Sequence, residues 1–106
     1  MNRNALNLGV SQNRLLAAYT AQLQRERYSR QTVRNYTNHF IRFLHYFESR
    51  VPSDLSAEDV NGYIQNQRTE RNLSDSTVNV LSYSIRYYYE RVLSSPKHVI
   101  SFSYRK

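Results

Sequence analysis

The sequence predicts an all-α fold, a compact bundle of four helices. Four times a serine follows an apolar residue and precedes another apolar residue by four positions, and each copy opens an apolar stripe at helical spacing. A serine oxygen accepts a hydrogen bond from the free amides of a helix's first turn, so each copy predicts a helix start. No strand pattern competes, because the only β-like stretch is the short segment 99–104. The four starts are Val10-Ser11, Tyr28-Ser29, Leu55-Ser56 and Leu73-Ser74.

The first helix is expected at 11–27. Its apolar residues recur on one side at the spacing of an amphipathic helix. Three alanines flank that stripe and permit close approach, either inside the bundle or against another protomer. The stripe comprises Leu15, Leu16, Tyr19 and Leu23, and the alanines are Ala17, Ala18 and Ala21.

The second helix is expected at 29–48 and the third at 56–71. The segment Val51-Pro52 ends the second, because a proline disfavours helical geometry in the residue before it. The third begins with a capping box in which Ser56 is followed by Asp59, and acidic residues in a first turn suit the helix dipole.

The fourth helix is expected at 74–93, where Pro96 and the serines before it end it. It repeats the second helix at an offset of 45 residues. Ser29, Thr32 and Val33 correspond to Ser74, Thr77 and Val78, and the stripes that follow also correspond. The inward residues of the second helix are Val33, Tyr36, Phe40, Phe43, Leu44 and Phe47, and those of the fourth are Val78, Leu81, Ile85, Tyr88, Tyr89 and Val92.

Composition restricts the class of protein. The chain has 106 residues, which fits a single domain, and it has no cysteine, which suits a reducing cytosol and excludes disulfides and thiolate chemistry. No apolar run approaches the length that spans a bilayer, so we expect a cytoplasmic protein without a membrane partner. The formal charge is +7, and thirteen of the fifteen cationic residues are arginine. Arginine meets phosphate through a flat fork, so the composition favours nucleic acid as a partner.

The outward face of the second helix is the clearest candidate for such a contact. It carries three arginines and several amide side chains, and no carboxylate occurs between Tyr28 and Phe47. An ordinary solvated face mixes both signs, and asparagine and glutamine bond base edges and phosphates. The face comprises Gln31, Arg34, Asn35, Asn38, Arg42 and His45, with Arg30 in the first turn.

The outward face of the fourth helix is expected to hold Ser76, Asn79, Tyr83, Arg86 and Tyr87. Two surface tyrosines one turn apart would pack on a partner domain, contact a nucleic-acid backbone or be merely tolerated, and the sequence leaves these three readings open. The starts of the second and fourth helices each present free amides and partial positive charge, which makes both candidate phosphate sites. Thr32 and Thr77 lie at the stripe edges, where a first-turn hydroxyl reaches phosphate.

The sequence contains no pattern that indicates catalysis, metal binding or cofactor binding. The pair His39 and Arg42 lacks a second catalytic group, and the three histidines lack the spacing of a metal site. The two glycines, Gly9 and Gly62, form no phosphate-binding loop, and no Ser, His and Asp set is defensible. We therefore expect no cofactor, no metal and no enzyme activity from this chain alone.

The residues resemble a known family. The run from Tyr28 to Tyr36, followed by Phe40-Ile41-Arg42-Phe43-Leu44, is similar to the opening of the core-binding domain of tyrosine recombinases, the phage-integrase family. The third and fourth helices follow in the same order, with Leu55-Ser56 to Ile64 and Leu73-Ser74 to Tyr89. The resemblance spans about residues 11–96, and Ser95-Pro96-Lys97 resembles the family's linker to its catalytic domain.

The resemblance implies a SAM-like bundle of four helices that forms one jaw of a clamp around double-stranded DNA. The asparagine-rich residues 1–10, with the lone Gly9, are expected to be a flexible leader, and the resemblance implies a DNA core-binding domain at 11–96 and the start of a linker at 97–106. The strand-cleaving chemistry belongs to a separate catalytic domain, so neither Tyr104 nor Tyr87–Tyr89 is expected to be a nucleophile. The other partners are that domain and further recombinase protomers on a mobile element's DNA. The DNA-binding role is carried onto Ser29, Arg30, Thr32, Arg34, Asn35, Asn38, Arg42, Ser74, Ser76, Thr77, Asn79, Tyr83 and Arg86.

Two other classes of function remain as alternatives. A helix-turn-helix transcription regulator has a short recognition helix after a brief turn, whereas the second and fourth helices here are long and separated by a whole helix. A helical protein-interaction module would use Tyr83 and Tyr87 as anchors, with the charge serving solubility. Alanine substitution of those tyrosines or of Arg34 and Arg42 separates the readings.

Overall fold

The computed structural model describes residues 8–94, and its regular elements are all helical. The four α-helices are α1 (Val10–Arg25), α2 (Arg30–Tyr46), α3 (Ala57–Glu70) and α4 (Asp75–Tyr87). A short 3₁₀ turn, η1 (Pro52–Asp54), precedes α3, and a π-helical turn, η2 (Tyr88–Val92), follows α4. The predicted fold class and the four predicted helices are confirmed. Residues 1–7 of the predicted leader and the predicted linker at 97–106 lie outside the described residues.

Three of the four predicted serine caps form. The Ser29 Oγ accepts a hydrogen bond from the Thr32 amide at 3.1 Å, and the Ser74 Oγ accepts one from the Thr77 amide at 3.2 Å. Ser56 and Asp59 make the full capping box, with 3.0 Å from the Asp59 amide to Ser56 and 2.9 Å from the Ser56 amide to Asp59. Each cap satisfies amides that the helix itself leaves without an acceptor.

The start of α1 differs from the prediction, because Ser11 is not its cap. The helix begins at Val10 with Gly9 as the capping residue, so Ser11 lies inside the first turn. Gln12 explains the shift. Its Oε1 accepts a hydrogen bond from the Gly9 amide at 3.3 Å, and its Nε2 donates to the Leu44 carbonyl of α2 at 2.8 Å. A buried glutamine thereby bonds the amide of the capping residue, and no serine hydroxyl caps the first turn of α1.

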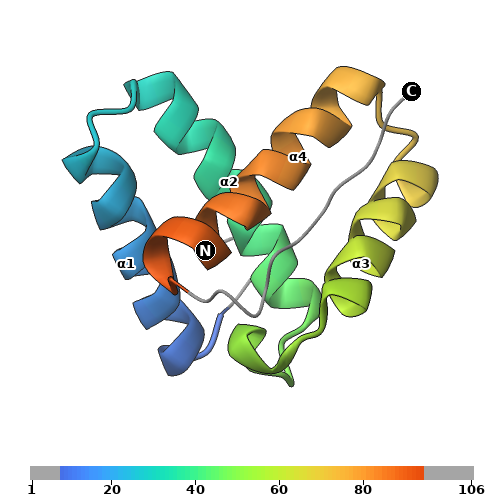
Figure 1. Cartoon of the computed structure of the whole chain (residues 1–106), viewed down its shortest axis with the longest axis horizontal. Coiled ribbons are helices and arrows are strands. Elements are labelled where there is room, and N and C mark those ends of the chain that lie inside the picture. Colours follow the sequence, from blue (N-terminus) through green and yellow to red (C-terminus); the bar gives the residue numbers. More distant parts are fainter. Residues whose placement is uncertain (1–7, 95–106) are drawn as a thin grey trace. The chain divides into compact units, whose positions relative to one another are not determined.

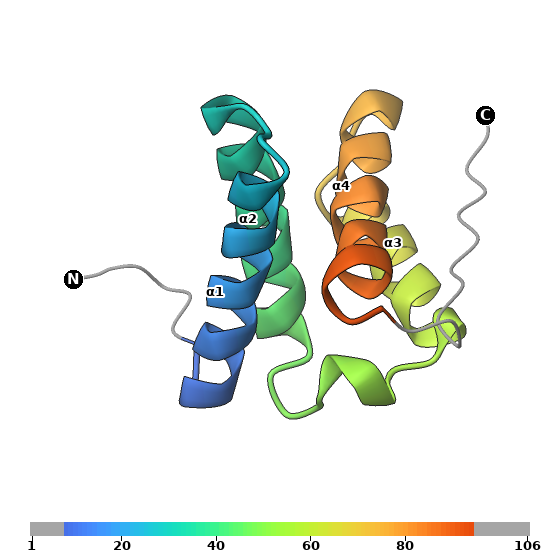
Figure 2. The same ribbon diagram turned by 60° about the vertical axis from the view of Figure 1, so that its left-hand side comes forward.

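Residues 8–52 form one compact unit, in which α1 and α2 lie side by side as a helical hairpin (Figures 1 and 2). The rings of Tyr19 and Phe40 stack between the two helices, with centroids 4.1 Å apart and planes within 10°. Leu23, Phe43 and Leu44 are buried as well. The apolar stripes predicted for these two helices therefore meet each other, which fixes the outward direction of the α2 arginines.

Residues 53–94 form a second compact unit that contains α3, α4 and η2. Its buried residues come from all three elements, and α3 and α4 lie side by side in Figures 1 and 2. Burial raises the pKa of Tyr88, and burial together with the nearby Tyr88 and Asp59 raises that of Tyr89. The core residues are Leu55, Val60, Tyr63, Ile64, Val78, Leu81, Ile85, Tyr88 and Tyr89.

The end of the predicted fourth helix also differs from the prediction. The α-helix stops at Tyr87, and the π-helical turn is closed by a 2.8 Å hydrogen bond from the Leu93 amide to the Tyr88 carbonyl. Tyr87 was expected to face outward, yet only 7% of it is exposed, and Tyr88 and Tyr89 are buried too. Three consecutive residues cannot lie on one side of a regular helix. The assumption that the helix has a single buried side is therefore wrong at this end.

The turn between α1 and α2 and the turn between α3 and α4 have the same backbone structure. Arg27 and Asn72 adopt left-handed conformations, with φ of 64° and 50°. Three backbone hydrogen bonds close each turn, and every donor and acceptor of the first has its counterpart 45 residues later in the second. The bonds are Glu26 to Gln22, Arg27 to Gln24 and Tyr28 to Leu23 in the first, and Arg71 to Gln67, Asn72 to Thr69 and Leu73 to Arg68 in the second.

Candidate nucleic-acid interface

The start of α2 is the first candidate surface. Besides capping the helix, the Ser29 hydroxyl donates to the Thr32 Oγ1 at 3.0 Å, so the Thr32 oxygen acts as an acceptor there and its own proton remains available to another group. Arg30 occupies the first helical position, and the first turn contains no acidic residue. The partial positive charge of this helix terminus is therefore not offset within its own turn.

The outward face of α2 continues this surface along the helix. Arg30, Arg34, Asn38 and Arg42 are exposed and follow one another at four-residue spacing, which places them in one row. The side chains of the three arginines make no hydrogen bond or ion pair with any residue in the described range 8–94. Beside this row, the Gln31 Nε2 donates to the Asn35 Oδ1 at 3.2 Å. The face thus presents three uncompensated cations.

The start of α4 repeats the hydroxyl geometry of α2 but not its charge. The Ser74 hydroxyl bonds Thr77 Oγ1 at 3.0 Å and lies 3.3 Å from Ser76 Oγ. Asp75 occupies the first helical position, and its carboxylate forms an ion pair with Arg68 of α3. In α2 this first helical position holds Arg30, which has no such partner within residues 8–94, so the two helix starts differ in charge.

The outward face of α4 is polar and aromatic. Tyr83 is 57% exposed, and the Arg86 guanidinium lies over its ring at 5.7 Å from the centroid. The Arg86 Nε is also 3.1 Å from the Glu90 Oε2, so the charge of this arginine is compensated. This face offers hydroxyl and amide groups with little net charge.

None of the thirteen predicted site residues is buried. Within each unit the predicted residues cluster at one helix start and along one helix face. Thr32, Thr77 and Arg86 are half-buried, and the rest are exposed, namely Ser29, Arg30, Arg34, Asn35, Asn38, Arg42, Ser74, Ser76, Asn79 and Tyr83.

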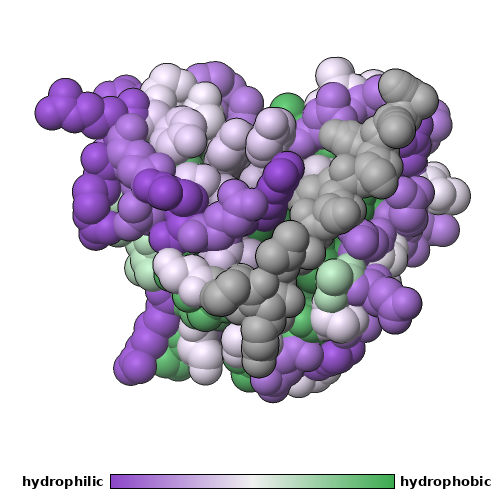
Figure 3. Space-filling model, viewed as in Figure 1, coloured by the Kyte–Doolittle hydropathy of each residue, from purple (hydrophilic) through white to green (hydrophobic). Residues whose placement is uncertain are grey.

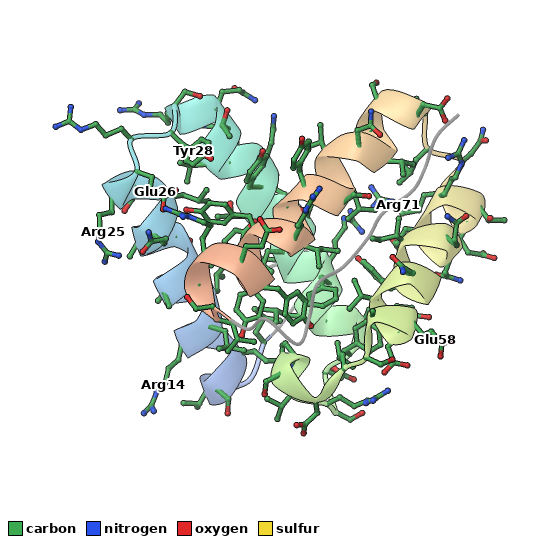
Figure 4. The ribbon with its side chains drawn as sticks, viewed as in Figure 1. Arg14, Arg25, Glu26, Tyr28, Glu58 and Arg71 are labelled. Atoms are coloured by element: carbon green, nitrogen blue, oxygen red, sulfur yellow. The ribbon has the colours of Figure 1, made fainter. Side chains whose placement is uncertain are left out.

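Two arginines next to this surface were not among the predicted residues. Arg25 ends α1 and Arg27 lies in the α1–α2 turn, and both are exposed. The surface over this turn is hydrophilic, as Figure 3 shows at upper left. Figure 4 shows Arg25 extending away from the ribbon, with Glu26 and Tyr28 beside the turn. The sequence does show four closely spaced arginines, at 25, 27, 30 and 34. The periodicity of a single helix, however, gives no information on residues outside that helix.

A cavity of about 210 Å³ in the first unit is separate from these surfaces. It is lined by the start of α1 and by the segment after α2, including Val10, Gln12, Arg50 and Pro52. No predicted site residue lines it. Within residues 8–94 there is no group of three or more His, Asp or Glu side chains placed to hold a metal ion, and no helix long and apolar enough to cross a membrane.

The arrangement defines an all-helical domain built from two hairpins, with an uncompensated basic face on one of them. The comparison with protein families identifies it further. Residues 15–98 match the model of the phage integrase N-terminal SAM-like domain, and the chain belongs to that family. A search of curated proteins found no match. The resemblance noted in the sequence is thereby confirmed, and the chain is of the recombinase and integrase class.

Proposed function

We propose that this chain is the DNA-binding domain of a site-specific tyrosine recombinase, and that it holds duplex DNA at the recombination core site during integration or excision. The strand-cleaving chemistry then belongs to a separate catalytic domain of the same protein. Further recombinase protomers on the DNA of a mobile element are its other partners, in the cytoplasm. Membership in the phage integrase family supports a role in site-specific recombination. The exposed arginines of α2 support the contact with DNA.

The observation that carries the proposal is the carboxylate-free face of α2. Arg34 and Arg42 lie two turns apart with Asn38 between them, and all three side chains are exposed. A cation that has no internal partner is free to replace the counterions of a phosphate, which is the main source of affinity in nonspecific DNA binding. The amide groups beside these arginines supply donors and acceptors for phosphate or base edges.

The surface of α4 is proposed to contribute hydrogen bonds rather than charge. Ser76 and Asn79 are exposed near its start, and Tyr83 follows Asn79 by one turn. Because Arg86 is held by Glu90, its charge is already compensated in the free protein. We therefore assign most of the salt-dependent affinity to α2 and expect α4 to position the DNA.

An amide NMR titration tests the proposal. The labelled 106-residue chain is titrated with a short DNA duplex at low salt and again at higher salt. The proposal predicts salt-sensitive shifts at 29–42 and 74–86. The double variant R34Q/R42Q should weaken binding and lower the salt slope by roughly 0.9 for each lost phosphate contact. R14Q removes one exposed charge from α1 and serves as the control. Shifts scattered over other residues, or no shifts, would refute DNA binding through these faces.

The exposed ring of Tyr83 favours one other function, a protein-interaction module. In that case Y83A abolishes binding of a protein partner, while R34Q and R42Q have little effect on it. Tyr87 no longer belongs to this test, because it is buried and its truncation would disturb the core. Tyr83 alone is a weak anchor, since Arg86 already covers part of its ring.

A further inference from the structure

The two turns share a backbone structure, but the residues around them differ in charge. The end of α1, the first turn and the start of α2 hold arginines at four positions whose counterparts, 45 residues later, are two acids and two asparagines. Between positions 25 and 34 the only acid is Glu26, and its counterpart Arg71 is the only arginine between positions 70 and 79. The pairs are Arg25 with Glu70, Arg27 with Asn72, Arg30 with Asp75 and Arg34 with Asn79, and Glu26 with Arg71.

The four arginines of the first turn are exposed, and we name them the turn cluster. Arg25 donates one hydrogen bond, to the Gln22 side chain, and the other three side chains have no polar partner within the described residues. The Gln22 Nε2 donates to the Glu26 carboxylate at 2.7 Å. Four guanidinium groups therefore lie within ten residues of chain, and none of them forms an ion pair with a residue in the range 8–94.

The same asymmetry extends through each unit. Residues 8–52 contain seven arginines and two glutamates, whereas residues 53–94 contain four arginines and six carboxylates. The net positive charge of the described chain therefore resides on the α1–α2 hairpin. Because the two turns share a backbone structure but differ in charge, the second turn serves as a reference for the first. A contact that depends on backbone shape alone would be made by both turns.

We infer that the turn cluster binds the phosphodiester backbone of duplex DNA, so that Arg25 and Arg27 extend the α2 surface around the turn, and that the α3–α4 turn takes no part in this contact. The inference rests on the proposed function and adds to it a division of labour between the two turns. Arg27 is held in a left-handed conformation by the three turn hydrogen bonds, so its backbone is ordered before DNA arrives. Less conformational entropy is then lost on binding.

Phosphate fits the turn cluster better than the carboxylates of an acidic protein do. Arginine forks match phosphate geometry, and the cluster adjoins the Ser29 and Thr32 hydroxyls. A protein interface would also need an apolar anchor at its centre. Tyr28 is the only large apolar residue of the turn, and its ring already contacts that of Tyr36, with centroids 6.0 Å apart.

The test compares matched substitutions in the two turns of the 106-residue chain. R25Q/R27N removes two charges of the turn cluster, and R27N introduces the residue that the second turn has at the same place, so the turn geometry is retained. R71Q is the control, since Arg71 is exposed and bonded to Gln67 much as Arg25 is to Gln22. Binding of a fluorescent DNA duplex is measured by anisotropy as a function of salt concentration, and folding by circular dichroism.

For R25Q/R27N we expect the slope of log K against log salt to fall by about two, and the affinity at about 0.1 M salt to drop at least tenfold. R71Q should bind like the parent chain. If the parent binds DNA and R25Q/R27N binds equally well, the inference is wrong while the proposed function stands. If R71Q is as impaired as R25Q/R27N, the division between the turns is wrong. If the parent binds no duplex at all, the proposed function itself fails.

A competition experiment separates phosphate from carboxylate. Polyglutamate and a DNA duplex are compared as competitors at equal total charge, with the labelled duplex bound to the parent chain. We expect the DNA to compete and the polyglutamate to be at least tenfold weaker. Equal competition would overturn the assignment to phosphate and favour an acidic protein as the partner.

Discussion

Arg27 and Asn72 hold the same left-handed backbone conformation at equivalent positions of two turns, 45 residues apart. Asparagine tolerates this region, whereas arginine pays the steric cost of its Cβ there. The turn hydrogen bonds hold Arg27 in place despite that cost. A residue kept where the backbone disfavours it suggests a role for its side chain.

The cost at Arg27 gives a prediction about stability. R27G should raise the free energy of unfolding by about 0.5–1 kcal/mol, since glycine adopts positive φ without a steric penalty. N72G should raise it less, because asparagine already tolerates the conformation. Urea denaturation monitored by circular dichroism measures both. A loss of stability in R27G would show that the arginine side chain contributes more to folding than its backbone costs.

The serine caps give a second prediction. S29A and S74A should each lower the free energy of unfolding by about 1 kcal/mol, because each removes the acceptor of a first-turn amide. S11A is the matched control, since Ser11 lies exposed inside the first turn of α1 and caps nothing. Its effect should stay within about 0.5 kcal/mol. If all three variants lost the same free energy of unfolding, the removal of a helix cap would not be its cause.

Gln12 gives a third prediction. Its Nε2 is the partner of the Leu44 carbonyl near the end of α2, and the residue is buried. Q12A should lower the free energy of unfolding by about 1–3 kcal/mol, since it leaves that carbonyl without its partner and opens a small void. Q24A, at an exposed position of the same helix, should change it by less than about 0.5 kcal/mol. Thermal or urea unfolding followed at 222 nm compares the two, and similar losses would contradict this role for Gln12.

The buried tyrosines predict loss of stability at alkaline pH. The pKa values of Tyr88 and Tyr89 are raised by burial, so the folded state holds their protons at a pH where the unfolded chain releases them. The stability they confer is complete below pH 10, the ordinary tyrosine pKa. Above it the free energy of unfolding should fall by up to about 1.4 kcal/mol per pH unit for each tyrosine. Urea denaturation between pH 8 and 11 measures this slope. Y89F, if folded, should show a shallower one, and an unchanged slope would exclude Tyr89 as a contributor.

Much of the fold was predictable because it rests on local chemistry. The caps at Ser29, Ser56 and Ser74 depend on a few neighbouring residues, and a sequence pattern expresses them directly. The start of α1 was missed because Gln12 bonds a carbonyl 32 residues away, and no local pattern reports such a partner. The burial of Tyr87 was missed because helix periodicity changes at η2.

The candidate site divides in the same way. The exposed arginines of α2 follow from periodicity, since α1 covers the opposite stripe. The charge difference between Arg30 and Asp75 at the two helix starts is visible in the sequence, whereas the ion pair of Asp75 with Arg68 is not, because those two residues meet across a turn. Arg25 and Arg27 could not be predicted in this way, because they precede α2 and its periodicity does not extend to them. Extending the 45-residue comparison backwards through the turn would have found them.

The π-helical turn η2 also sets the direction in which the chain leaves α4. Its closing bond spans five residues instead of four, so one extra residue is accommodated without a loop. Leu93 and Ser94 therefore lie about 100° around the helix axis from where an unbroken α-helix would place them. Deleting the exposed Glu90 would convert the turn to α-helix and reset that heading. One residue at this position thus sets the heading of the chain at Leu93 and Ser94 without any change in the sequence of the α2 and α4 surfaces.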